Sequence, residues 1–177
     1  ITDRLVALSR ALIGRIRGGL AQVNVLVSMF FAGMNGSVVA DTATVGALVL
    51  PAMKKAGYPA AFSAAVTGVS STIGGIIPPS IMMIVLANST EISIASLFAA
   101  GIIPGVMIGV VIMIINHYFA IKYNIERSDQ PFSIRRAGKE LYRSSFALLI
   151  PLVLVGSVMG GVASVVEAGA ITAMVAL

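Results

Sequence analysis

The sequence predicts an all-α integral membrane protein, and three observations carry this prediction. Hydrophobic residues make up 58% of the 177 residues and charged residues 11%, whereas a soluble domain carries about 25% charged residues; the mean hydropathy is +1.00. The Lys and Arg residues fall in blocks between apolar stretches, a pattern typical of membrane topology and not of nucleic-acid binding. Two apolar stretches are interrupted by polar runs, which predicts broken helices inside the bilayer.

The first segment, residues 1–18, is predicted to be an amphipathic basic helix that lies on the membrane surface as an arm. Its apolar residues recur at steps of three and four, which places them on one helical face: Leu5, Leu8, Leu12 and Ile16. Arginines are interspersed among them, as expected where a helix faces lipid headgroups.

Residues 19–55 are apolar with a polar centre at 35–44, and the distribution of charge decides how this segment runs. A single crossing would place Lys54 and Lys55 on the side opposite the arginines of residues 1–18. A re-entrant hairpin with its tip at 35–44 returns the chain to the side it entered. We favour the hairpin, because all twelve Lys and Arg residues then share one side, which the positive-inside rule makes cytoplasmic.

The remaining segments follow from this topology. Residues 59–90 are predicted to form a discontinuous transmembrane helix, and residues 92–121 a helix that crosses back. Residues 122–143 are predicted to be a cytoplasmic loop, with six basic and three acidic residues. Residues 144–163 are long enough to span the bilayer, and residues 164–177 begin another apolar segment.

The interruption of the second segment contains Gly74, Gly75, Pro78 and Pro79 within six residues, and these must break a helix. Proline has no backbone N–H, so the carbonyls of Gly74 and Gly75, four residues upstream, lose their helical donors. We expect these carbonyls to be free for a cation, as in the discontinuous helices of secondary transporters.

The polar centre of the hairpin offers hard oxygen ligands from Asn35, Ser37, Asp41 and Thr42. An ionisable residue within a membrane segment marks a functional site by default. Two roles are open for Asp41, that of a ligand and that of a cap on the second half-helix.

A different role is expected for the glycines at 101, 105 and 109, which are spaced four residues apart. Small residues at this spacing pack helices against one another, so we expect a packing face here and not a binding site.

Several classes of function are excluded. The chain has no Cys and one His, which excludes thiolate and His-cluster metal sites. It has no Gly-x-Ser-x-Gly, His-Glu-x-x-His or Walker motif, so we expect neither an enzyme nor transport powered by ATP bound to this chain. The sequence begins at Ile1 without Met and ends in an apolar stretch, so we expect it to belong to a longer protein.

Specific motifs surround both interruptions and continue along the chain. In order they are Arg17-Gly18-Gly19-Leu20-Ala21, Gly36-Ser37-Val38-Val39-Ala40-Asp41-Thr42-Ala43, Pro51-Ala52-Met53-Lys54-Lys55-Ala56-Gly57-Tyr58, Ser70-Ser71-Thr72-Ile73-Gly74, Ile76-Ile77-Pro78-Pro79-Ser80-Ile81 and Leu97-Phe98-Ala99-Ala100-Gly101-Ile102-Ile103-Pro104-Gly105. Together they resemble the large membrane subunit of a tripartite ATP-independent periplasmic (TRAP) transporter.

The resemblance implies a multi-pass protein of the bacterial inner membrane, surrounded by membrane lipid. It implies a Na⁺-driven elevator built from two inverted repeats, with one repeat present here and residues 164–177 starting the second. The implied partners are a periplasmic substrate-binding protein and a small four-helix membrane subunit. The implied substrates are organic anions, such as C4-dicarboxylates or sialic acid.

The resemblance also implies a sodium site shared between the two interruptions. Oxygens of Asn35 and Ser37 would meet the backbone carbonyls of Gly74, Ile77 and Pro79. An adjoining site would be lined by five polar residues, Asp41, Thr42, Ser71, Thr72 and Ser80.

Three positions depart from the family pattern. Asn35 stands where the family often has Ser, Gly75 where it usually has Pro, and residues 163–168 replace its common Phe-Thr-Pro-Thr-Glu-Ala join. The resemblance, with these departures, implies a Na⁺-coupled importer of organic anions. The alternative is a membrane subunit that serves as a scaffold for assembly without transporting.

Overall fold

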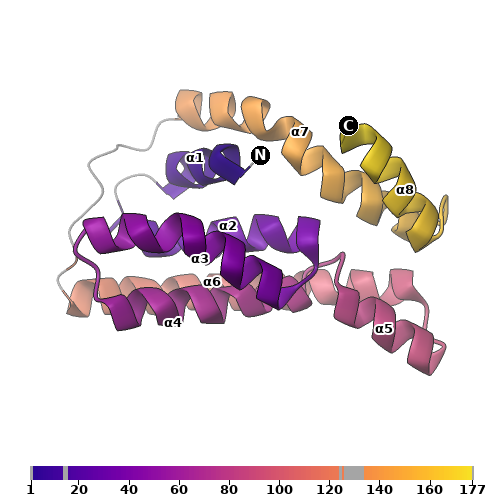
Figure 1. The fold of residues 1–177 in the computed structure, drawn as a ribbon, viewed down its shortest axis with the longest axis horizontal. Coiled ribbons are helices and arrows are strands. Elements are labelled where there is room, and N and C mark those ends of the chain that lie inside the picture. The colour runs from indigo at the N-terminus through magenta and orange to yellow at the C-terminus, as the bar shows by residue number, and fades with distance from the viewer. Residues whose placement is uncertain (1, 14–15, 124, 126–133, 177) are drawn as a thin grey trace.

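The computed structural model describes residues 2–13, 16–123, 125 and 134–176, and every regular element in these ranges is a helix (Figure 1). The elements are α1 (Thr2–Ile13), α2 (Gly19–Asn35), α3 (Val38–Lys55), α4 (Ala60–Ser71), the 3₁₀ turn η1 (Thr72–Gly75), α5 (Ile81–Thr90), α6 (Ile94–Lys122), α7 (Ile134–Met159) and α8 (Val165–Ala176). The all-α prediction is confirmed for the described residues.

Residues 19–55 form two helices that fold back on each other, not one. Helix α2 ends at Gly36, which has a left-handed φ of 57° and donates its amide to the Ala32 carbonyl at 3.2 Å. Ser37 then caps α3 by accepting the Ala40 amide. At the other end of the pair, the Leu20 amide donates to the Tyr58 hydroxyl at 3.3 Å. The chain therefore returns to the end at which α2 began.

The predicted discontinuity of residues 59–90 is present. Helix α4 ends at Ser71, η1 follows, and α5 begins only at Ile81, with Ser80 as its N-cap. The peptide bond between Pro78 and Pro79 is cis. Residues 76–80 therefore separate two half-helices, as the glycines and prolines predicted.

Helix α6 is long and apolar enough by length and composition to cross a membrane, whereas α2, α5, α8 and the apolar part of α7 are shorter. Its glycine face packs as predicted. A β-carbon on Gly101 would lie 2.5 Å from the Ile76 carbonyl oxygen, one on Gly105 would collide with Ile77, and one on Gly109 would lie 2.6 Å from the Met29 sulfur. Small residues on α6 therefore let the break lie directly against it.

The predicted loop over residues 122–143 was too long. Helix α7 begins at Ile134 and not at residue 144. The basic residues near its start alternate with good helix formers such as Ala, Leu and Glu, which favour a helix that continues beyond its apolar part. Helix α8 begins with a capping box, in which the Glu167 carboxylate accepts the Ser164 amide at 2.8 Å.

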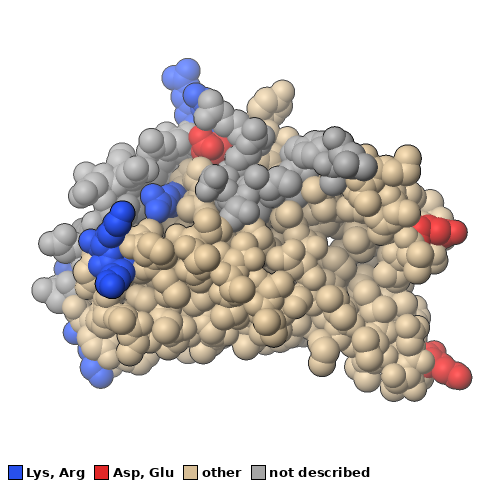
Figure 2. All heavy atoms as spheres, viewed as in Figure 1, with Lys and Arg blue, Asp and Glu red and all other residues tan. Residues whose placement is uncertain are grey.

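Charge is distributed unevenly along the molecule. Figure 2 shows Lys and Arg side chains gathered toward the end where α3 leads into α4 and on the side of the α7 start, with acidic side chains at the opposite end, near α5 and α8, and one acidic patch beside the basic ones on the α7 side. This separation agrees with the distribution expected from the positive-inside rule.

Candidate functional site

The two interruptions lie directly against each other. The Ile81 amide at the start of α5 donates to the Gly36 carbonyl at 3.1 Å. A β-carbon on Gly36 would collide with the Pro79 carbonyl oxygen. The left-handed glycine at the hairpin turn therefore serves two purposes, reversing the chain and admitting the backbone of the break.

The contact continues along the start of α3. A β-carbon on Gly74 would lie 3.7 Å from the Ser37 carbonyl oxygen and 3.8 Å from the Asp41 β-carbon. One on Gly75 would lie 3.2 Å from a methyl group of Val38. The structure thus brings Ser37 and Gly74, one residue from each interruption, side by side.

The expectation that the Gly75 carbonyl is free was wrong. This carbonyl accepts the Ser80 hydroxyl at 2.8 Å, and the same hydroxyl oxygen accepts the Met83 amide as the N-cap of α5. The side chain of Ser80 is buried, so this serine replaces the helical donor that Pro79 cannot supply.

Four helix ends meet around this contact. Helix α2 and the α4–η1 segment end at the contact with their C-termini. Helices α3 and α5 begin there with their N-termini. Helix C-termini carry partial negative charge and N-termini partial positive charge. The arrangement therefore offers carbonyl oxygens for a cation and amide groups for an anion within one small region.

The predicted ligands differ in their exposure. Gly74 and Pro79 are buried, Ser37 and Ile77 are half-buried, and Asn35 is exposed. The Ile77 side chain packs on α6 against Gly105.

Two predicted lining residues are exposed and bond within their own segments. The Thr42 hydroxyl donates to the Val38 carbonyl at 2.8 Å, and the Thr72 hydroxyl donates to the Val69 carbonyl at 2.7 Å. Their hydroxyl oxygens keep lone pairs on the exposed surface.

Asp41 does not cap α3, since Ser37 holds the N-cap position. The Asp41 side chain is fully buried in the first turn of α3, and neither carboxylate oxygen has a hydrogen-bond partner among the described residues. Of the two roles left open by the sequence, that of the cap is excluded.

The sequence interpretation missed a buried polar ladder between α2 and α4. The Asn24 amide donates to the Thr67 hydroxyl at 2.7 Å, the Ser70 hydroxyl donates to the Asn24 side-chain oxygen at 3.3 Å, and the Ser28 hydroxyl donates to that of Ser70 at 3.4 Å. The spacing could have indicated it: Asn24 and Ser28 are four residues apart, and Thr67 and Ser70 are three apart, so each pair lies on one helical face.

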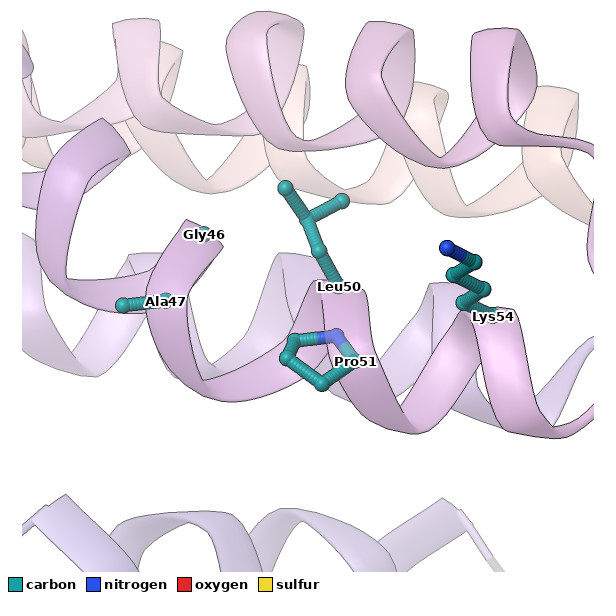
Figure 3. Close-up of a pocket in the computed structure, with 5 residues that line it drawn as sticks. All are labelled: Gly46, Ala47, Leu50, Pro51 and Lys54. Atoms are coloured by element: carbon teal, nitrogen blue, oxygen red, sulfur yellow. The ribbon is translucent and has the colours of Figure 1, made fainter.

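A shallow open groove lies along α3, away from the tip. It is lined by apolar residues and one lysine: Gly46, Ala47, Leu50, Pro51 and Lys54 (Figure 3). None of the predicted site residues lines it, so the candidate site is the contact between the tip and the break.

Comparison with known proteins identifies the family. The model of the tripartite ATP-independent periplasmic transporter, DctM component, matches residues 1–177. The C4-dicarboxylate TRAP transporter large permease protein DctM of Pseudomonas aeruginosa is 34% identical over 98% of this chain and 40% of its own length. The 2,3-diketo-L-gulonate TRAP transporter large permease protein YiaN of Escherichia coli K12 is 37% identical over 100% of this chain and 41% of its own length.

A longer relative gives the same result. The sialic acid TRAP transporter permease protein SiaT of Haemophilus influenzae is 37% identical over 98% of this chain and 28% of its own length. The chain thus spans less than half the length of these relatives. It belongs to the DctM component family of tripartite ATP-independent periplasmic transporters.

Proposed function

We propose that this chain forms part of a Na⁺-coupled importer of organic anions in the bacterial inner membrane. A periplasmic binding protein delivers the anion, and a small membrane subunit completes the complex. The observation that carries the proposal is the contact of Gly36 with Pro79 and Ile81, which joins a hairpin tip to a helix break. Discontinuous helices that meet in this way build ion and substrate sites in secondary transporters.

The proposed Na⁺ site uses the carbonyl-rich side of this contact. Oxygens of Asn35 and Ser37 and the backbone carbonyls of Gly74, Ile77 and Pro79 are its ligands. Hard oxygen ligands suit a hard cation, and the contact between Ser37 and Gly74 supports a site shared by both segments. A cation here would order the tip and the break together, which links its binding to the shape of the substrate site.

The proposed anion site uses the amide-rich side. The first turns of α3 and α5 begin at Ser37 and Ser80, and helix N-termini attract carboxylates. We assign the adjoining region to the five residues that the resemblance implies, of which Thr42 and Thr72 are exposed and Asp41, Ser71 and Ser80 are buried. The relatives are named for C4-dicarboxylate, 2,3-diketo-L-gulonate, sialic acid and isethionate. These compounds share an anionic group, so we infer an organic anion for this chain.

The proposed mechanism places the hairpin as a re-entrant element that dips in from the cytoplasmic side. The chain would supply one of two inverted repeats of an elevator transporter, with the second repeat in the rest of the full-length protein. The return of the chain near Leu20 and Tyr58 supports the hairpin path, and the clustering of Lys and Arg at that end supports its cytoplasmic orientation.

The test is uptake by the full-length complex reconstituted in vesicles with its binding protein, with and without an inward Na⁺ gradient. Uptake should require the gradient and should be lost in Gly74→Leu, whose side chain would enter the proposed site. Gly74→Ala is the matched control, because its β-carbon makes only ordinary contacts. Uptake independent of Na⁺ would overturn the coupling. A Gly74→Leu variant that assembles poorly but transports normally per complex would support the scaffold alternative.

A further inference from the structure

The groove on the surface of α3 takes no part in the proposed transport site. It is shallow and open, and the described residues that line it are Gly46, Ala47, Leu50, Pro51 and Lys54. These positions recur at alternating steps of one and three, so they form one face of the helix about 12 Å long. Gly46 and Ala47 supply almost no side chain, which leaves the face hollow at the end away from Lys54.

Lys54 is charged and ends this apolar face. It belongs to the last turn of α3 and is exposed. The side chains of Leu50 and Lys54 project from the same side of α3 (Figure 3), and none of the described lining residues is acidic. The groove therefore combines an apolar floor with a cation at the basic end of the molecule.

An aromatic cluster indicates that this end of α3 lies at the level of the lipid headgroups. Tyr58 stacks on Phe62 with ring centroids 6.3 Å apart, and Phe62 packs against Tyr123, at the end of α6, at 6.0 Å. Tyrosines gather where a membrane protein crosses the boundary between lipid and water. The Tyr58 amide donates to the Met53 carbonyl, one residue before Lys54. Lys54 thus lies close to the headgroups, and the groove extends from there toward the hydrocarbon.

An occupant of the groove must match both its apolar floor and its cation. A small soluble anion would meet one charged donor beside an apolar face. A packed protein segment would remove Lys54 from water, which is costly unless an acidic side chain pairs with it. A phospholipid meets both requirements, because its acyl chain covers the floor while its phosphate reaches Lys54 at the hydrated surface. A shallow, open face also suits a flexible chain.

We propose that this groove binds an anionic phospholipid from the leaflet at the basic end of the molecule. The acyl chain lies along residues 46–51, and the phosphate is held by Lys54. The inference goes beyond the proposed transport function and does not depend on Na⁺ coupling. Because α3 is the second helix of the hairpin, the lipid contacts the element that carries the tip.

The test is photo-crosslinking of the full-length complex in nanodiscs of phosphatidylcholine. The probe is phosphatidylglycerol with a photoactivatable acyl chain, compared with phosphatidylcholine that carries the same chain, and mass spectrometry maps the labelled residues. Phosphatidylglycerol should label residues 46–54 about fivefold more strongly, the effect expected of one lysine beside an anionic lipid.

Two substitutions and one control locate the site. Lys54→Gln should lower labelling by phosphatidylglycerol to the level of phosphatidylcholine. Lys55→Gln is the matched control, since Lys55 is also exposed and in the last turn of α3 but does not line the groove; it should leave labelling unchanged. Ala47→Phe should remove labelling of residues 46–54 by both lipids, because its ring fills the floor. Ala47 is exposed, so the fold accommodates this ring.

Three results would overturn the proposal. Equal labelling of residues 46–54 by the two lipids would mean that Lys54 does not recognise the headgroup. Equal losses in Lys54→Gln and Lys55→Gln would mean a diffuse attraction to the basic end and not a site in the groove. Labelling of other segments but not of residues 46–54 would mean that the rest of the full-length protein covers the groove.

Discussion

Gly36 and Pro79 touch through their backbones, and this contact joins the turn of the α2–α3 hairpin to the break between α4 and α5. The Gly36 carbonyl also receives the Ile81 amide at 3.1 Å, two residues beyond Pro79. With φ at 57°, Gly36 occupies a conformation that other residues adopt at a cost. One glycine is thus required by the turn and, independently, by the neighbouring backbone.

Substituting Gly36 separates these two requirements when it is compared with Gly57. Gly57 also has a positive φ, 76°, but a β-carbon there would meet nothing within 4 Å. Gly57→Ala should cost about 1 kcal/mol of stability, from the left-handed conformation alone. Gly36→Ala should cost a further 1–3 kcal/mol, roughly the range for overpacking, and should abolish uptake. Thermal unfolding of the full-length protein in detergent measures both; equal shifts would show that the contact with Pro79 contributes nothing.

The glycine face of α6 gives a second comparison. Gly101→Ala would force its β-carbon against the Ile76 carbonyl, a backbone atom that cannot rotate away, whereas Gly156→Ala on α7 would meet nothing within 4 Å. We expect Gly101→Ala to displace the break from α6 and to lower Na⁺-dependent uptake severalfold. Gly156→Ala should transport at the unmodified rate. Normal uptake by Gly101→Ala, at normal amounts of assembled protein, would contradict this role.

The sequence predicted the break, the turn and the glycine packing, because each depends on a backbone property of Gly or Pro that holds in any fold. Gly74, Gly75, Pro78 and Pro79 end a helix wherever they occur together. The fate of the Gly75 carbonyl was not predictable in this way. It depends on Ser80, five residues away, turning its hydroxyl back across the break.

The role of Asp41 shows the same limit. Its position in the sequence allowed Asp41 to cap α3. The cap position, however, is fixed by the residue at which the helix begins. Because the chain turns at Gly36, Ser37 is the first residue that can occupy the cap. The start of α7 was missed because a charged helix extending beyond its apolar part resembles a loop in composition.

The polar ladder between α2 and α4 should contribute measurable stability. Asn24 and Thr67 are both buried, and their side chains share a 2.7 Å hydrogen bond. A double-mutant cycle with Asn24→Ala and Thr67→Val should give a coupling energy of about 0.6 kcal/mol, with roughly 1.7 as an upper bound for such pairs in membranes. Unfolding of the four proteins in mixed micelles measures it. Strictly additive effects would mean that the two residues do not stabilise each other.

The orientation of the hairpin can be tested by labelling, since this chain contains no cysteine. Ile16, Lys55 and Glu91 are exposed and flank the hairpin and the broken helix. In full-length protein freed of other cysteines, Ile16→Cys and Lys55→Cys should react with an impermeant maleimide only in inverted vesicles. Glu91→Cys should react only in right-side-out vesicles, because the positive-inside rule places the basic end in the cytoplasm. Reaction of Ile16→Cys and Lys55→Cys from opposite sides would mean that residues 19–55 cross the membrane, and the tip could not then enter from the cytoplasmic side.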